Sequence, residues 1–212
     1  MSKIRAKFMR GEQAKYISHL DLLRTFERSL RRVKLPIAYS KGFNPHPDIV
    51  FGLPLSVGVT SDSEYADFGL DSDISSEEFL ERLNLGLPEG LKIIAAQKIT
   101  DGKNIMAIIN KASYSVTLVK TRDDLKEKVD LFLAQKEIMA DKKTKSGIKR
   151  LDIKPMIFAL EVEDGEDICL KMKVSAGNNT NLNPQVLVAA LGEFVSGGFK
   201  ILRIHRTELE VE

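Results

Sequence analysis

The stretch "SHLDLLRTFERSLRRV", residues 18–33, has the pattern of an amphipathic helix. Its apolar side chains recur every three or four residues, as one face of a helix requires. They are Leu23, Phe26, Leu30 and Val33. Ser18 stands three residues before Asp21, a spacing that resembles a capping box with Asp in place of Glu or Gln. The pattern predicts one helix to about Val33, and Pro36 ends it.

Segments of strand and helix character surround this helix in an order that occurs twice. In the first half, strands are expected at 2–9, 35–40, 48–58, 63–70 and 90–99, with a second helix at 75–87. In the second half, strands are expected at 112–120, 136–143, 148–163, 167–177 and 199–211, with helices at 121–135 and 183–195. Charge follows the same repeat, because each half has a basic part followed by an acidic part.

This repeat predicts an α+β protein of two tandem ferredoxin-like (split βαβ) domains with antiparallel sheets. The first domain is expected to comprise residues 1–101 and the second residues 112–212. Residues 102–111 would be the connector.

Several classes of protein are disfavoured by composition. The chain of 212 residues has one cysteine, Cys169, and a net charge of only +2. A single thiol supplies neither an internal disulfide nor the cradle of an iron–sulfur cluster, and the three histidines lack metal-site spacing. We therefore expect no metal and no cofactor in this chain. No signal core and no membrane-length apolar run is present, so a cytoplasmic location without membrane contact is expected.

The first candidate interface is the polar face of the predicted helix at 18–33. Arginines occupy roughly a third of its circumference or less, opposite the apolar stripe. They are Arg24, Arg28, Arg31 and Arg32. Such a face suits phosphate recognition, because each guanidinium offers a planar fork of donors. The alternative is a solvated face, partly paired with Asp21 and Glu27.

The second candidate is the loop "YSKGFNPHP", residues 39–47. Two prolines restrict it, and a glycine permits a positive φ or a close approach of a ligand. Its predicted ligand residues are Tyr39, Ser40, Lys41, Gly42, Phe43, Asn44 and His46. We expect Tyr39, Lys41, Asn44 and His46 to share one pocket with at least one of His19 and Arg24. The alternative is a turn that packs on the helix through Phe43.

Two further groups are candidates. His19, at the start of the first helix, and His46 are the candidate catalytic residues, because a neutral imidazole can act as a general base. A capping role for His19 is the alternative. A basic tip is also predicted to grip phosphates, although a solvated loop is the alternative. It consists of Lys142, Lys143, Lys145, Lys149 and Arg150.

Residues 18–32, the stretch "LPIAYSKGFNPHPDIVFGLPLSVGV" and "SEYADF" together resemble the radical-SAM-linked protein family, an uncharacterised bacterial domain. Members of that family are fused to a radical SAM protein or encoded beside one. The resemblance implies a radical SAM partner, which would carry the iron–sulfur cluster and the S-adenosylmethionine. It assigns no catalytic residue.

Three functions remain open at this stage. The chain is expected to be an accessory RNA-binding module for tRNA or rRNA, with Tyr39 or Phe43 available for stacking. It could instead be a protein-interaction subunit that completes the radical SAM enzyme without contacting RNA. The third alternative is a metal-independent endoribonuclease that uses His19 and His46. We expect the chain to have no catalytic activity of its own.

Overall fold

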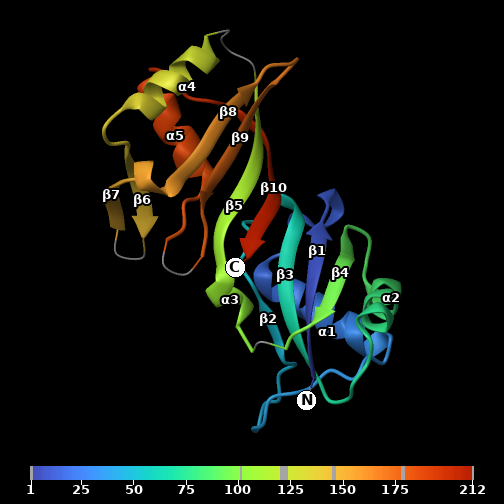
Figure 1. Cartoon of the computed structure of the whole chain (residues 1–212). Coiled ribbons are helices and arrows are strands. Elements are labelled where there is room, and N and C mark those ends of the chain that lie inside the picture. Colours follow the sequence, from blue (N-terminus) through green and yellow to red (C-terminus); the bar gives the residue numbers. More distant parts are fainter. Residues whose placement is uncertain (1, 101, 120–123, 145–146, 178–179, 212) are drawn as a thin grey trace. The chain divides into compact units, whose positions relative to one another are not determined.

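The chain divides into two compact units in the computed structural model, which describes residues 2–100, 102–119, 124–144, 147–177 and 180–211 (Figure 1). The first unit comprises Met1–Ile109 and Glu208–Glu212, and the second comprises Asn110–Thr207. The predicted second domain ran unbroken to residue 212, whereas the last five residues belong to the first unit. Lys7 pairs with Glu208 at 2.9 Å, and the Leu209 N–H donates to Ser63 Oγ at 3.1 Å.

The first unit consists of a sheet covered by two helices. Strand β1 lies between β3 and β4, and β2 pairs with β3; these three pairings are antiparallel. Its elements are β1 (Ser2–Arg10), the 3-10 turn η1 (Glu12–Ala14), α1 (His19–Arg32), β2 (Ile49–Phe51), β3 (Thr60–Leu70), α2 (Ser76–Gly86), β4 (Leu91–Lys98) and α3 (Ile105–Ile108).

The second unit repeats this layout with an added hairpin. Its sheet has the order β10-β5-β9-β8, while β6 and β7 form a separate two-stranded sheet. Its elements are β5 (Ile109–Leu118), α4 (Leu125–Ala134), β6 (Met139–Thr144), β7 (Gly147–Asp152), η2 (Lys154–Met156), β8 (Ile157–Glu163), β9 (Ile168–Ser175), α5 (Pro184–Phe194) and β10 (Ile201–Val211).

The structure is therefore a mixed α+β fold with mostly antiparallel strands, as the sequence indicated. In both units the first strand of the repeat is central in the sheet order, next to the third and the last. The finer assignment, two tandem ferredoxin-like domains, stays a prediction.

Helix α1 begins where the sequence placed it. The Asp21 N–H donates to the Ser18 side chain at 3.2 Å, and the Ser18 hydroxyl donates to the Asp21 carboxylate at 2.7 Å. The first of these bonds satisfies a free N–H at the helix start. The second is the largest cause that lowers the pKa of Asp21, and Arg24 lowers it by a smaller amount. The sequence thus identified the first turn correctly.

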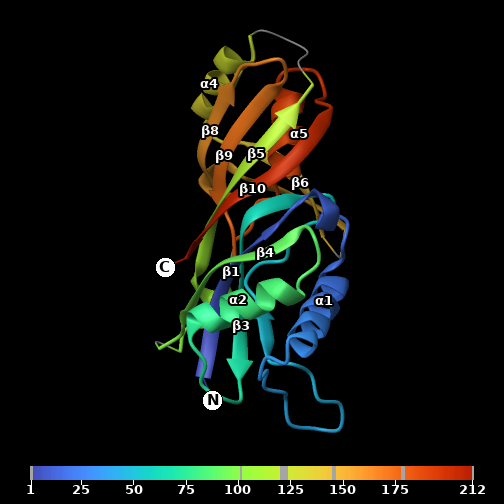
Figure 2. The same cartoon turned by 90° about the vertical axis from the view of Figure 1, so that its right-hand side faces the viewer.

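Aromatic rings hold α1 and α2 on one face of the first sheet (Figure 2). Phe68 of β3 contacts both Phe26 of α1, with ring centroids 5.8 Å apart, and Phe79 of α2, at 5.1 Å. Phe8 of β1 and Phe51 of β2 also contact Phe26. This contiguous cluster fixes where α1, and hence its outer face, lies on the sheet.

The segment 35–40 is not the continuous strand that its sequence suggested. It makes only isolated bridges, Ile37 to Leu70 and Tyr39 to Pro47. Pro36 has no N–H to donate to a neighbouring strand, which interrupts the pairing. Ile37 and Ala38 are nevertheless buried, so the segment is anchored in the core just before the loop begins.

Candidate nucleic-acid interface

The outer face of α1 exposes the four arginines that the sequence singled out. Arg24 pairs with Asp21 at 3.3 Å and Arg31 with Glu27 at 2.6 Å, both in largely exposed positions on the arginine side. For Arg28, no hydrogen bond or ion pair is present among the described residues. Exposed pairs of this kind contribute about 1 kcal/mol or less, so a phosphate can replace the carboxylate at little cost.

Arg32 differs from the other three because it is used within the fold. Its guanidinium donates to the Gly86 carbonyl at 3.2 Å, at the C-terminal end of α2. An added Cβ on Gly86 would lie 2.8 Å from the Ser29 carbonyl oxygen, so the two helices approach closely at this point. Arg32 therefore caps the neighbouring helix, and three of the four predicted arginines remain as the outward cationic face.

Tyr39 links that face to the loop. The Arg31 Nε donates to the Tyr39 hydroxyl at 3.1 Å, and the guanidinium carbon lies 5.9 Å from the centroid of the ring. This hydrogen bond, more than the nearby Glu27, raises the pKa of Arg31 above its ordinary value. The base of the loop is thus joined to the C-terminal end of α1.

The loop itself is closed at its base and exposed at its tip. The Ser40 N–H donates to the His46 carbonyl at 2.8 Å, and the His46 N–H donates back to Ser40 Oγ at 2.9 Å. Gly42 has φ 146°, in the region that favours glycine, as the sequence suggested. Residues 40–46 are all exposed, so the alternative that Phe43 anchors the loop on the helix is wrong.

The charged side chains between the middle of α1 and the end of the loop are all positive. Residues 28–47, here called the basic segment, contain five Lys or Arg residues and neither Asp nor Glu. The five are Arg28, Arg31, Arg32, Lys34 and Lys41. Because the segment includes the last turn of α1 and the whole loop, its charges gather at one end of the first unit. Such a cluster attracts a polyanion, and salt would weaken that attraction.

His19 does not join the loop. It lies at the first turn of α1, where its ring packs against Phe51 at 5.4 Å between centroids. Arg31, which the loop base contacts, is 12 residues further along the helix. At 1.5 Å per residue this separation is about 18 Å along the axis. The expected pocket shared by the loop and His19 therefore does not form, and the loop meets α1 at Arg31 rather than at Arg24.

The cavity beside His19 is too small for a ligand, although the side chain is exposed to solvent on its other side. Phe8, Arg10, Phe51 and Glu64 line a cavity beside it of about 10 Å³, which is at most the volume of one water. Within the described part of the chain, no group of His, Cys, Asp and Glu residues has the arrangement of a metal site.

The basic tip lies on the β6–β7 hairpin. Backbone pairing sets Asp141 opposite Arg150 and Lys142 opposite Lys149, and the side chains of Lys149 and Arg150 are exposed. Lys145 lies outside the described residues, as do the side chains of Lys142 and Lys143. The predicted strands around a basic turn are confirmed by the hairpin.

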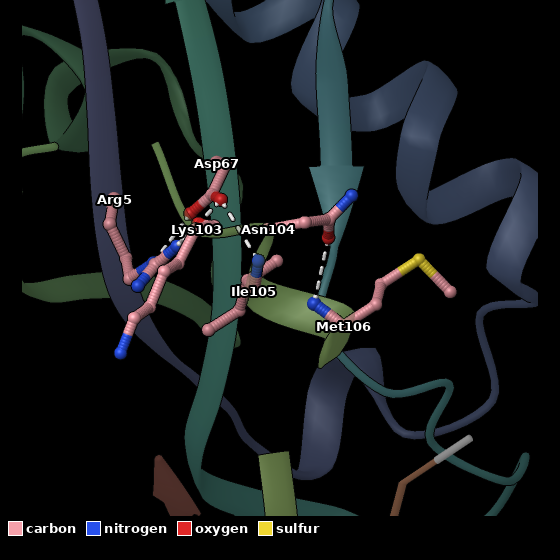
Figure 3. A network of polar contacts seen from close by, with 6 residues as sticks. All are labelled: Arg5, Asp67, Lys103, Asn104, Ile105 and Met106. Atoms are coloured by element: carbon pink, nitrogen blue, oxygen red, sulfur yellow. Dashed lines mark hydrogen bonds and ion pairs between the residues drawn. The ribbon is translucent and has the colours of Figure 1, made fainter. Parts of the chain in front are cut away.

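A buried ion pair in the first unit was missed by reasoning from the sequence (Figure 3). The Arg5 Nε donates to Asp67 Oδ1 at 2.7 Å and its NH2 group donates to Asp67 Oδ2 at 2.9 Å. Arg5 also donates to the Lys103 carbonyl at 2.7 Å, while the Ile105 N–H donates to Asp67 at 3.3 Å. These bonds tie the segment predicted as a connector to β1 and β3.

Arg10 is a second buried charge that the sequence pattern did not reveal. It is 1% exposed and donates to the carbonyls of Ala14, Lys15 and Ile17. It therefore shapes the turn that leads into Ser18 and α1. The only sequence signal for Arg5 and Arg10 is a charge inside a strand that is otherwise half apolar, and such charges are usually exposed.

Comparison with protein families identifies residues 3–184 with a family described as an uncharacterized protein conserved in bacteria (DUF2344). The chain belongs to this family. The match includes α1, the loop and the buried ion pair. The family description names no radical SAM protein, so that partner remains only an implication of the resemblance.

Comparison with solved structures finds a similar fold in a chain of the "Crystal Structure of a Cbf5-Nop10-Gar1 Complex". The TM-score is 0.54 at 12% identity; the match covers 98% of the present chain but 48% of the other, about half its length. At this identity the likeness shows the fold alone. No curated protein matches the sequence. Of the helices in the described residues, none combines the length and hydrophobicity needed to cross a membrane.

Proposed function

We propose that the chain is an RNA-binding module whose basic segment, with Arg24, holds the phosphate backbone of tRNA or rRNA. The observation that carries this proposal is the set of positive charges in residues 28–47 together with Arg24, which is exposed on the same helix face as Arg28 and Arg31. Arginine forks match the geometry of phosphate oxygens, and a run without acidic residues does not repel them. The likeness to a chain of the Cbf5-Nop10-Gar1 complex supports the fold and adds no residue to this argument.

The arginine face gives a direct test. Replacing Arg24, Arg28 and Arg31 by alanine is expected to weaken binding of unfractionated tRNA roughly 10- to 100-fold at low salt, at ~0.5–1 kcal/mol for each exposed contact. The slope of log affinity against log salt should fall by about two to three units, because each lost guanidinium releases one counterion fewer. A gel shift at a series of salt concentrations measures both quantities.

The matched control removes the same charge elsewhere. Lys92, Lys126 and Lys136 are exposed and lie outside the basic segment. Replacing all three by alanine gives a variant with the same net charge as the triple arginine variant. It should bind tRNA with nearly the parent affinity and slope. Equal affinity of the parent and the triple arginine variant at low salt would remove the basis of the proposal.

A partner subunit role is supported by a different surface. Tyr16, Leu20 and Val57, here called the apolar end, are 73%, 63% and 59% exposed. The Gly58 N–H donates to the Lys15 carbonyl at 2.8 Å, which brings Val57 beside Tyr16 near the start of α1. We propose that the radical SAM protein implied by the family resemblance contacts this end, while the basic segment holds RNA.

Charge at the apolar end should disrupt that contact. Leu20→Glu with Val57→Glu is expected to lower co-purification with a radical SAM protein encoded beside the gene at least about tenfold, because burying an unpaired charge costs more than ~1.4 kcal/mol. Leu85→Glu is the control, because Leu85 is also exposed but lies on α2. Undiminished recovery of the partner by the double variant, or no recovery by the parent, would contradict this role.

The endoribonuclease alternative gains no support from the geometry. His19 lies at the first turn of α1, whereas the base of the loop that carries His46 contacts the helix at Arg31, about 18 Å further along its axis. A general base and a general acid must both reach the same reacting group. We therefore do not propose a nuclease.

A further inference from the structure

The tip of the loop carries an aromatic ring that the fold does not use. Phe43 is fully exposed. Of the other nine phenylalanines of the chain, five are at most 1% exposed, namely Phe8, Phe26, Phe68, Phe79 and Phe132, and Phe51 is half-buried against the core. Figure 2 shows the loop between α1 and β2 projecting from the body of the first unit. Phe43 therefore contributes nothing to the core of its own unit.

The loop base holds this ring in a defined place. Two hydrogen bonds join Ser40 to His46, and a bridge joins Tyr39 to Pro47. The Asp48 N–H donates to the Ala38 carbonyl at 2.8 Å, which joins the two chain segments just outside the loop as well. A closed base with two prolines loses less conformational entropy on binding than an open loop would. The exposed ring is thus presented for contact.

Tyr39 also carries an aromatic ring in the loop, but it has a different role. Its hydroxyl accepts from Arg31 and its ring lies beneath the same guanidinium. It is half-buried and packs against the core cluster. Tyr39 is therefore a positioning residue that joins the loop to the arginine face, and Phe43 is the ring free to stack.

We infer that the loop binds unpaired nucleotides of RNA, with the base stacked on Phe43 and the adjoining phosphates held by Lys41 and the arginine face. This inference rests on the proposed function and names the form of RNA that it takes. Stacking needs an exposed face of a base, which a duplex hides within its stack. Phe43 lies four positions after Tyr39, at most about 14 Å of extended chain, so one RNA strand can contact both the loop and the helix.

Charge and composition favour RNA over the other surfaces that an exposed Phe could contact. Between Ser40 and His46 the only large apolar side chain is Phe43, and one inserted ring gives weak attachment to a lipid bilayer. An apolar groove of a protein would gain little from the cations of the basic segment. RNA is a polyanion that also offers aromatic faces, so it matches both the exposed ring of Phe43 and the positive charge of the basic segment.

The experiment compares two RNAs and four proteins by fluorescence anisotropy. The probes are an oligouridine of about 12 nucleotides, a length within the range of known single-strand sites, and a blunt duplex of the same length. The proteins are the parent, Phe43→Ala, Phe43→Trp and the triple arginine variant. Phe43→Ala should weaken oligouridine binding about 5- to 150-fold, with an unchanged salt slope and little change for the duplex. Phe43→Trp should restore the affinity, because it restores the stacking surface.

Failure of this inference is distinguishable from failure of the proposed function. If Phe43→Ala binds oligouridine as the parent does while the triple arginine variant loses affinity, the basic face binds RNA and the stacking role is wrong. If the triple arginine variant also binds as the parent does, or if the parent binds neither RNA, the stacking inference and the proposed function are both wrong. Vesicles of neutral and anionic phospholipid form the last arm. Loss of vesicle binding by Phe43→Ala, with RNA binding unchanged, would assign the loop to a membrane surface instead.

Discussion

Replacing Asp67 by asparagine is expected to lower the free energy of unfolding of the first unit by about 3–5 kcal/mol, the usual cost of leaving a buried charge unpaired. Arg5 and Asp67 are 6% and 7% exposed and are joined by two parallel hydrogen bonds of 2.7 and 2.9 Å. Asparagine keeps the size of the side chain but removes the charge, so Arg5 would remain buried without its counterion. Urea denaturation followed by far-UV circular dichroism measures the loss.

Two variants separate the buried charge from a general effect of substitution. Asp73→Asn removes an exposed partner of Lys98, 2.6 Å away, and should cost about 1 kcal/mol or less. Arg5→Met with Asp67→Leu removes both charges and should recover much of the lost stability, because apolar side chains of similar volume often replace a buried pair without penalty. A loss for Asp67→Asn no larger than that for Asp73→Asn would contradict the expectation.

The second large effect is expected at Phe26. Replacing it by alanine should lower the free energy of unfolding by about 3–5 kcal/mol, because the lost burial and the cavity left behind both contribute. Phe26 is fully buried and its ring contacts Phe8, Phe51 and Phe68 at centroid distances of 5.2, 5.5 and 5.8 Å. A domain is typically stable by only about 5–15 kcal/mol, so this loss is large. The same urea denaturation measures it.

Phe43→Ala is the matched control for Phe26→Ala, since it removes the same atoms from a fully exposed position. It should change the free energy of unfolding by less than about 0.5 kcal/mol. Similar losses at both positions would mean that Phe26 is not the centre of the core. A selective loss at Phe26 would also show that any effect of Phe43→Ala on RNA binding does not arise from unfolding.

Local interactions were predicted well from the sequence. The start of α1 at Ser18 follows from hydrogen bonds between residues three apart, and its arginine face follows from helical periodicity. The mixed α+β class follows from the order of strand and helix patterns. The closed loop follows from its prolines and glycine, because each acts on the backbone dihedrals of its own neighbourhood.

Contacts between distant residues were decided by the tertiary structure alone. Asp67 lies 62 positions from Arg5, and no pattern in either strand marks the two as partners. The strand at the C-terminus looked like part of the second domain, yet Glu208 pairs with Lys7 across 201 positions. The sequence predicted a pocket shared by His19 and the loop, but the length of α1 separates the first turn, with His19, from the last turn, where the loop contacts Arg31. The sequence by itself determined the longer helices, most of the strands and the charges of the basic segment, because these depend on neighbours along the chain. Only packing decided which charges are buried, which arginine caps α2 and which aromatic ring of the loop stays exposed, because these depend on what the folded chain brings alongside.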